Sequence, residues 1–173
     1  MEKVRTLTLY ALVLCTTFYA GLGAFFIICP FDQHFDTLTY IKYWQIVDGY
    51  MGKRMPIFGM IWLSTFVLNV IVFFKTWRVS PIFWIIVVCF CLLIADMSFT
   101  GKEQIPINQY IQSLDMNNLT SEQLAKLQGL RDQTNKNFGV RDYFQKAMFF
   151  LMSITPYLLS RLNQKMAIKK TRQ

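Results

Sequence analysis

Long apolar runs dominate the chain. Residues 7–29 contain no charged side chain, and a helix of this length spans about 34 Å, enough to cross the hydrocarbon layer of a bilayer. Three further runs follow, the last of which is interrupted by polar residues and by Pro156, where we expect a kink. The pattern predicts an all-α integral membrane protein, a bundle of four transmembrane helices formed as a single domain over residues 1–173. The predicted spans are residues 7–29, 55–74, 81–98 and 143–162.

The first long polar segment, residues 30–54, has the pattern of an amphipathic helix. Asp36 or Thr37 is a suitable N-cap. The spacing of the residues that follow favours a short helix in the membrane interface over a β-strand, the alternative indicated by the aromatic and β-branched content of LTYIKYWQIV. Pro56 is expected in the first turn of the second span, where its missing N–H costs nothing. The apolar and aromatic positions are Tyr40, Tyr43, Trp44, Val47 and Met51.

The second long polar segment covers residues 99–140. Gly101 is expected to form a turn after the third span, and Pro106 to begin a short helix. The sequence Thr120-Ser121-Glu122-Gln123 has the pattern of a capping box and predicts a polar helix that continues to Gln133. We therefore expect short amphipathic helices in both long loops of the bundle.

Composition supports a membrane location. The chain is 54% hydrophobic and only 16% charged, well outside the averages of soluble proteins. Its net charge of +8 comes from basic residues beside the apolar runs, a pattern set by membrane topology and anionic lipid rather than by nucleic acid. We expect membrane lipid and no nucleic acid among its partners, and the sequence is compatible with a homo-oligomer.

The distribution of charge predicts an orientation. Four spans would place both termini and the 75–79 turn on one side, which then has nine basic residues and one acid, whereas the other side has nine of each over two long loops. Because short cytoplasmic segments are enriched in Lys and Arg, we expect cytoplasmic termini and outer long loops, which in a bacterium means the inner membrane. The nine basic residues are Lys3, Arg5, Lys75, Arg78, Arg161, Lys165, Lys169, Lys170 and Arg172.

Asp96 is the first candidate for chemistry. A carboxylate at the end of an apolar span is costly unless it meets protein, water or a cation, and it therefore suggests a functional site. Arg141 and Gln145 lie at the outer end of a stripe on the fourth helix that continues through Met148, Met152 and Thr155. An Asp96–Arg141 pair would offset the desolvation of the carboxylate; the alternative is an ion pair that only holds two helices together.

His34 is the only histidine, which excludes a site of several imidazoles and bis-histidine haem ligation within one chain. Its acidic neighbours Asp32 and Asp36 could orient it as a general base, and an exposed loop histidine without a role is the alternative. The four cysteines and nine methionines are interpreted as buried apolar residues rather than as ligands of zinc or copper. We expect no metal and no cofactor.

Several short motifs resemble the anthrone oxygenase-like family of small four-helix membrane proteins, most of whose members have no assigned function. The motifs are the stretch from Gln45 to Arg54 that leads into Met55-Pro56, the element IPINQYI after the third span, and LQGLRD followed ten residues later by Arg141. Together with the arrangement of the four spans, they cover nearly the whole chain.

The resemblance implies a pocket at the outer mouth of the bundle, bounded by Asn108, Arg141 and the stretch from Gln45 to Pro56. In characterised fungal relatives the activity is oxygenation of a polyketide anthrone to a quinone without an obvious cofactor. Such a reaction needs a base, for which His34 and Asp96 are the candidates, and a dry aromatic slot. The slot would be lined by Tyr40, Tyr43, Trp44 and Tyr50, which could otherwise form an interfacial aromatic belt.

The sequence therefore suggests a protein that binds a small hydrophobic or amphipathic molecule in an outward-facing polar pocket, with an oxygenase-like activity as an extension of that function. The expected binding residues are Asn108, Arg141, Gln145, Gln45, Trp44 and Tyr50, and the expected catalytic residues are Asp96 and His34. The alternative is a non-catalytic membrane scaffold or accessory subunit that docks a partner through its outer loops.

Overall fold

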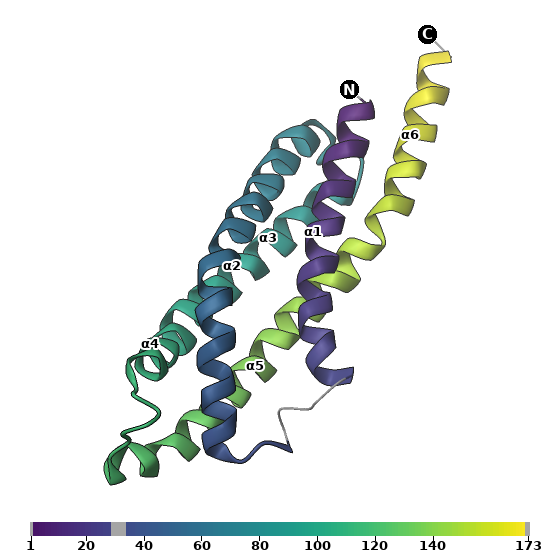
Figure 1. Ribbon diagram of the computed structural model, residues 1–173. Coiled ribbons are helices and arrows are strands. Elements are labelled where there is room, and N and C mark those ends of the chain that lie inside the picture. The colour runs from purple at the N-terminus through teal and green to yellow at the C-terminus, as the bar shows by residue number, and fades with distance from the viewer. Residues whose placement is uncertain (1, 29–33, 172–173) are drawn as a thin grey trace.

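The computed structural model describes residues 2–28 and 34–171, and these residues form helices without any β-strand. The bundle carries both chain ends and the connection between α2 and α3 at one end, and α4 at the other, which we call the α4 end (Figure 1). The elements are α1 (Glu2–Ile28), α2 (Thr37–Phe73), η2 (Phe74–Thr76), α3 (Ile82–Phe99), η3 (Thr100–Gln104), α4 (Ile105–Ser113), α5 (Ser121–Ser153) and α6 (Thr155–Thr171).

Helix α2 corrects the first loop prediction. The expected interfacial helix and the second span are one continuous helix of 37 residues, which at about 1.5 Å per residue is far longer than a bilayer is thick. Asp36 is the N-cap, as predicted, and its side chain accepts from the backbone N–H of Thr39 at 3.0 Å. Hydrogen bonds from the Thr39 hydroxyl and backbone N–H lower the pKa of the Asp36 carboxyl. Pro56 lies inside the helix rather than in its first turn, so it removes one helical hydrogen bond without ending the helix.

The chain after α3 also stays helical, so the predicted turn at Gly101 is wrong. Residues Thr100–Gln104 form a turn of π-helix that leads directly into α4, and no described glycine has a positive φ. Pro106 lies in the first turn of α4, as predicted. The π-turn inserts an extra residue into the helix, and such insertions are frequent at functional sites.

Helix α5 joins the predicted polar helix to the predicted fourth span. The capping box of Thr120 and Gln123 is present, but the helix does not stop near Gln133. It ends at Ser153, and α6 begins at Thr155, so the helix is interrupted at Ile154, two residues before Pro156, where a kink was expected. Among the described residues, three helical segments are long and apolar enough to cross a membrane, beginning in α1, α2 and α3.

The core divides into two clusters of buried side chains. The larger one joins α1, α2, α3, α5 and α6, and the smaller one lies at the α4 end between α2, α4 and α5. Asn69 of α2 is fully buried, and its side chain donates to the carbonyl of Thr8 in α1 at 2.8 Å. Large apolar side chains such as Leu14, Ile71 and Phe150 remain exposed on the outside of the bundle, as expected for a surface that faces lipid.

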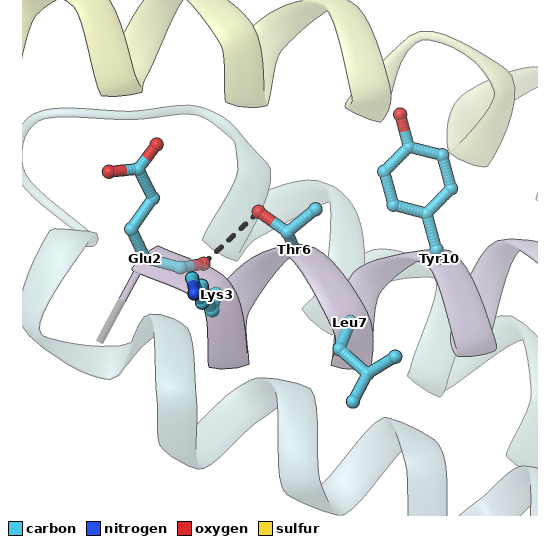
Figure 2. A pocket seen from close by; sticks show the side chains of 5 residues that line it. All are labelled: Glu2, Lys3, Thr6, Leu7 and Tyr10. Carbon is cyan, nitrogen blue, oxygen red and sulfur yellow. Dashed lines mark hydrogen bonds between the residues drawn. The ribbon is translucent and has the colours of Figure 1, made fainter.

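The end with the termini is held by contacts between α1 and α6. The Arg5 guanidinium donates to the sulfur of Met166 at 3.4 Å. Beside it, the first turns of α1 form a surface hollow in which Leu7 and Tyr10 point away from one another (Figure 2). The only bond drawn there is internal to the helix, from the Thr6 hydroxyl to the carbonyl of Glu2 at 3.1 Å. This hollow gathers no polar groups around a common point.

Candidate functional site

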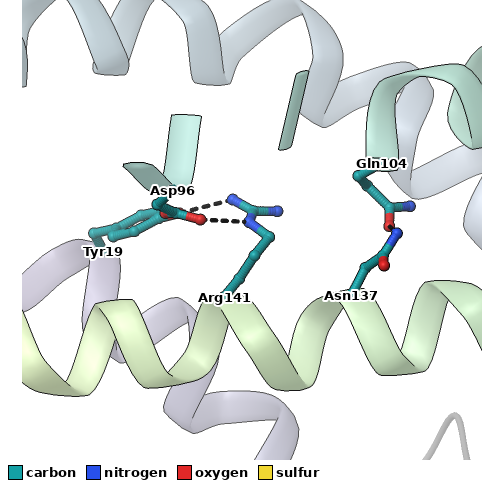
Figure 3. Close-up of polar contacts among 5 residues, drawn as sticks. All are labelled: Tyr19, Asp96, Gln104, Asn137 and Arg141. Atoms are coloured by element: carbon teal, nitrogen blue, oxygen red, sulfur yellow. Dashed lines mark hydrogen bonds and ion pairs between the residues drawn. The ribbon is translucent and has the colours of Figure 1, made fainter. Parts of the chain in front are cut away.

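A buried polar cluster joins three helices. Tyr19 of α1 donates its hydroxyl to Oδ2 of Asp96 in α3, and Arg141 of α5 donates from Nε to Oδ1 of the same carboxylate at 3.1 Å. Arg141 Nη2 closes the cluster by donating to the Tyr19 hydroxyl oxygen at 2.7 Å. Figure 3 shows the three side chains converging from their separate helices. The Asp96–Arg141 pair considered from the sequence is therefore present.

The Asp96 carboxylate is buried, and it therefore needs partners for both of its oxygens. Asp96 is 1% exposed, and a buried carboxylate is tolerated only when a counter-ion and hydrogen bonds replace water. Both of its oxygens accept from protein groups, one from Tyr19 and one from Arg141. The carboxylate thus fixes α3 against α1 and α5, and the Arg141 guanidinium compensates its charge.

A second polar network surrounds Asn108 at the α4 end. Its side-chain oxygen accepts from Gln104 Nε2 at 2.7 Å and from the indole N–H of Trp44 at 3.1 Å. Its side-chain nitrogen donates to Oδ1 of Asp48 at 2.6 Å. Gln112 Nε2 approaches the other oxygen of Asp48 at 3.3 Å. Asn108 therefore connects α4 to two functional groups of α2.

The same network extends to α5 through the π-turn. Asn137 Nδ2 donates to Oε1 of Gln104 at 3.0 Å and to the carbonyl of Glu103 at 3.2 Å. Figure 3 shows Gln104 reaching from the π-turn to Asn137, which lies on the same helix, α5, as Arg141. The π-turn is thus tied to α5, and this contact orients Gln104 toward Asn108.

A cavity of about 340 Å³ lies between these two networks, a volume typical of sites for small molecules. Its wall comes from α1, α2, η3, α4 and α5, and is mostly apolar, with polar side chains from both networks. The residues that line it are Tyr19, Leu22, Gly23, Trp44, Val47, Asp48, Met51, Gly52, Met55, Pro56, Thr100, Gln104, Ile105, Asn108, Phe138, Arg141 and Gln145.

Two residues of the cavity wall have buried polar atoms without a hydrogen-bond partner, Oγ1 of Thr100 and Oε1 of Gln145. Native proteins leave few such atoms, and each one suggests a missing ligand or water. Gln145 Oε1 also lies so close to Gly23 that a Cβ at this position would approach it to 2.1 Å. Glycine is therefore required at position 23 for Gln145 to lie as it does.

The structure brings together part of the predicted site. Trp44, Asn108, Arg141 and Gln145 line the cavity, and Asp96 supports it from behind Arg141. The remaining three predicted residues lie elsewhere. Gln45 donates to the carbonyls of Ile111 and Leu114 at the end of α4, Tyr50 is 61% exposed beneath Arg54, and His34 is exposed outside the cavity. The catalytic and binding roles assigned to all eight stay predictions.

Four residues of the site escaped sequence reasoning: Tyr19, Gly23, Asp48 and Gln104. Tyr19 and Gly23 follow Thr16 at spacings of three and four on one face of α1. This helical spacing alone could have placed both residues on the side of α1 that faces the bundle. Asp48 lies within the stretch from Gln45 to Pro56 that the resemblance placed at the pocket, but it was not singled out, although it follows Trp44 by one helical turn. Among the described residues, no group of three or more His, Cys, Asp or Glu side chains could hold a metal ion.

Comparison of the chain with protein family models, with curated proteins and with solved structures finds no match to any of them.

Proposed function

We propose that this protein is a four-span membrane protein that binds a small amphipathic molecule in the cavity at the α4 end of the bundle. The observation that carries the proposal is the cavity itself: an apolar space with a few converging polar groups, drawn from helices far apart in the sequence. Sites for small molecules in helical bundles have this composition and location.

Two features support four spans with the α4 end outside the cell. Helices α5 and α6 run alongside α1 and α3 (Figure 1), and the stripe of Gln145, Met148, Met152 and Thr155 is buried against them. The charge distribution described above favours cytoplasmic termini. On this topology the cavity opens toward the outer side of a bacterial inner membrane.

Binding, rather than oxygenation, is the function that the cavity supports. The resemblance to the anthrone oxygenase-like family implies an oxygenase, and its chemistry requires a base beside the substrate. Asp96 is paired with Arg141 and does not line the cavity, and His34 is exposed and does not line it either. Asp48, which does line it, is the remaining carboxylate for any proton transfer there.

The proposal is tested by blocking the cavity. Gly52 lines it, and a Cβ at this position meets no atom within 4 Å, so Gly52→Phe places a ring where the ligand would bind. Gly59→Phe is the matched control, because Gly59 lies on the same helix, also has space for a Cβ, and does not line the cavity. We expect mass spectrometry to find a small molecule that co-purifies with the wild type and with Gly59→Phe and is lost from Gly52→Phe.

An identical set of co-purifying molecules in all three preparations would contradict the proposal. Such a result would favour the alternative function, a non-catalytic scaffold or accessory subunit that docks a partner through the α4 end. Both variants should remain folded, since each added Cβ lies in open space. Size-exclusion profiles of the two variants check this.

A further inference from the structure

The sign of the charge in the cavity is set by Asp48. Among the described residues, the hydrogen-bond partners of its carboxylate are the neutral amides of Asn108 and Gln112, at 2.6 and 3.3 Å. No basic nitrogen of that part of the chain lies within 4.0 Å of it. A carboxylate can accept about four hydrogen bonds, so Asp48 has acceptor capacity left for a ligand.

The other charge in the wall is already compensated. Arg141 is paired with Asp96 at 3.1 Å, so the two networks together contain two carboxylates and one guanidinium, and a single negative charge remains. The nearby Lys53 and Arg54 line a different hollow with Tyr50, and Arg54 lies over the ring of that tyrosine at 5.2 Å. An anionic headgroup would therefore meet repulsion in the cavity, and a cation would meet attraction.

Helix α2 adds a second acceptor next to Asp48. Trp44, Asp48, Gly52 and Pro56 follow one another at intervals of four residues and all line the cavity, so they form one stripe along the helix. Pro56 has no N–H, and the carbonyl of Gly52, four residues earlier, therefore lacks its normal helical donor. The Asp48 carboxylate and a backbone carbonyl without its i+4 donor thus lie about one turn apart on the cavity side of α2.

We propose that the ligand is an amphipathic primary amine, whose ammonium group donates to Asp48 and to the carbonyl of Gly52 while its apolar tail fills the cavity. This inference rests on the proposed binding function and specifies the chemical class of its ligand. A primary ammonium has three N–H donors, which suit the carboxylate and carbonyl acceptors of this wall. The rings of Trp44 and Phe138, packed edge to face with centroids 5.0 Å apart, add attraction for a cation. The apolar side chains of Met51 and Met55 complete the surroundings of the tail.

The test compares three probes that share one alkyl tail: octylamine, octanol and octanoate. Binding to the full chain in nanodiscs of zwitterionic lipid is measured by calorimetry at neutral pH, with empty nanodiscs as the blank for partitioning into lipid. We expect octylamine to bind at least about tenfold more tightly than octanol, and octanoate more weakly than either. Octanol or octanoate binding as tightly as octylamine would overturn the inference and leave the binding function in place, whereas no saturable binding of any probe would remove both.

Charge variants identify the residue responsible. Asp48→Asn should reduce octylamine affinity to that of octanol, and Asp48→Glu should keep the preference. Asp132→Asn removes the same charge from an exposed position of α5, where the carboxylate accepts from Gln128 at 2.8 Å. Because Asp132 does not line the cavity, this variant should change nothing. A preference for octylamine that persists in Asp48→Asn would overturn the assignment to Asp48, and unchanged octanol affinity in that variant confirms that its cavity is intact.

Discussion

Arg141 donates to the carboxylate of Asp96 across 3.1 Å, although 45 positions separate the two residues in the chain. The pair closes the wall of the cavity on the side of α1, where Tyr19 bonds to both partners. Their side chains are 17% and 2% exposed, respectively, so water cannot replace either partner. The same contact therefore supports the fold and shapes the site.

Replacing Arg141 with Met should destabilise the protein strongly. The substitution leaves the Asp96 carboxylate buried without a cation, which typically costs about 3–5 kcal/mol of unfolding free energy. Adding Asp96→Asn should recover part of this loss, because the remaining group is then neutral. Reversible denaturation in detergent, followed by far-UV circular dichroism, measures both effects.

The control for this experiment is Lys126→Met, which breaks the exposed pair between Lys126 and Glu122. Exposed ion pairs contribute little because water screens them, so no measurable change is expected. If Arg141→Met were as harmless as the control, the Asp96–Arg141 contact would not compensate a buried charge.

Gly23 and Gly21 should respond differently to alanine. A helix interior normally gains about 0.5–1 kcal/mol when Gly becomes Ala, and Gly21 has open space for the methyl group. At Gly23 the new Cβ would lie 2.1 Å from Gln145 Oε1, so the glutamine must move and the gain should disappear. In a Gln145→Ala background the two substitutions should become equal, as thermal unfolding can show; a difference that persists there would locate the conflict elsewhere.

The sequence predicted local features of this fold better than the extent of its helices. The cap at Asp36, the capping box at Thr120 and the break before Pro156 all depend on chemistry within a few residues. The positions of Pro56 and Gly101 were predicted wrongly, because packing against neighbouring helices stabilises a helix that local propensity alone would end.

The same distinction applies to the site. Asp96 and Arg141 were paired correctly, since a buried carboxylate requires a cation and Arg141 lies at the polar end of the stripe on the fourth predicted helix. Asp48 was not singled out, because its contacts are with Asn108 and Gln112 of α4, and no local pattern in the sequence indicates them. The sequence therefore predicts residues whose burial is costly better than residues whose contacts depend on how distant helices pack.

Pro56→Ala should increase stability and weaken amine binding at the same time. Alanine restores the N–H that bonds to the carbonyl of Gly52, which should add about 1 kcal/mol or more to the unfolding free energy while removing one acceptor from the cavity. Pro106→Ala is the matched control, because Pro106 lies at the start of α4 and does not line the cavity, so this substitution should leave amine affinity unchanged. Thermal unfolding and octylamine titration measure the two effects, and a gain in stability with unchanged affinity would show that the Gly52 carbonyl does not contact the ligand.

Sidedness of labelling should establish whether α5 and α6 cross the membrane together. Ser121 begins α5, and Lys165 lies exposed in α6 near the opposite end of the bundle. In a background with the four native cysteines replaced by serine, Ser121→Cys should react with an impermeant maleimide in intact cells, and Lys165→Cys should react only after the membrane is opened. A cysteine at Lys3 serves as the internal control, because four spans put both ends of the chain on one side. Reaction of both Ser121→Cys and Lys165→Cys in intact cells would leave only the three apolar segments as spans, and the buried stripe of α5 would then be explained by packing outside the bilayer.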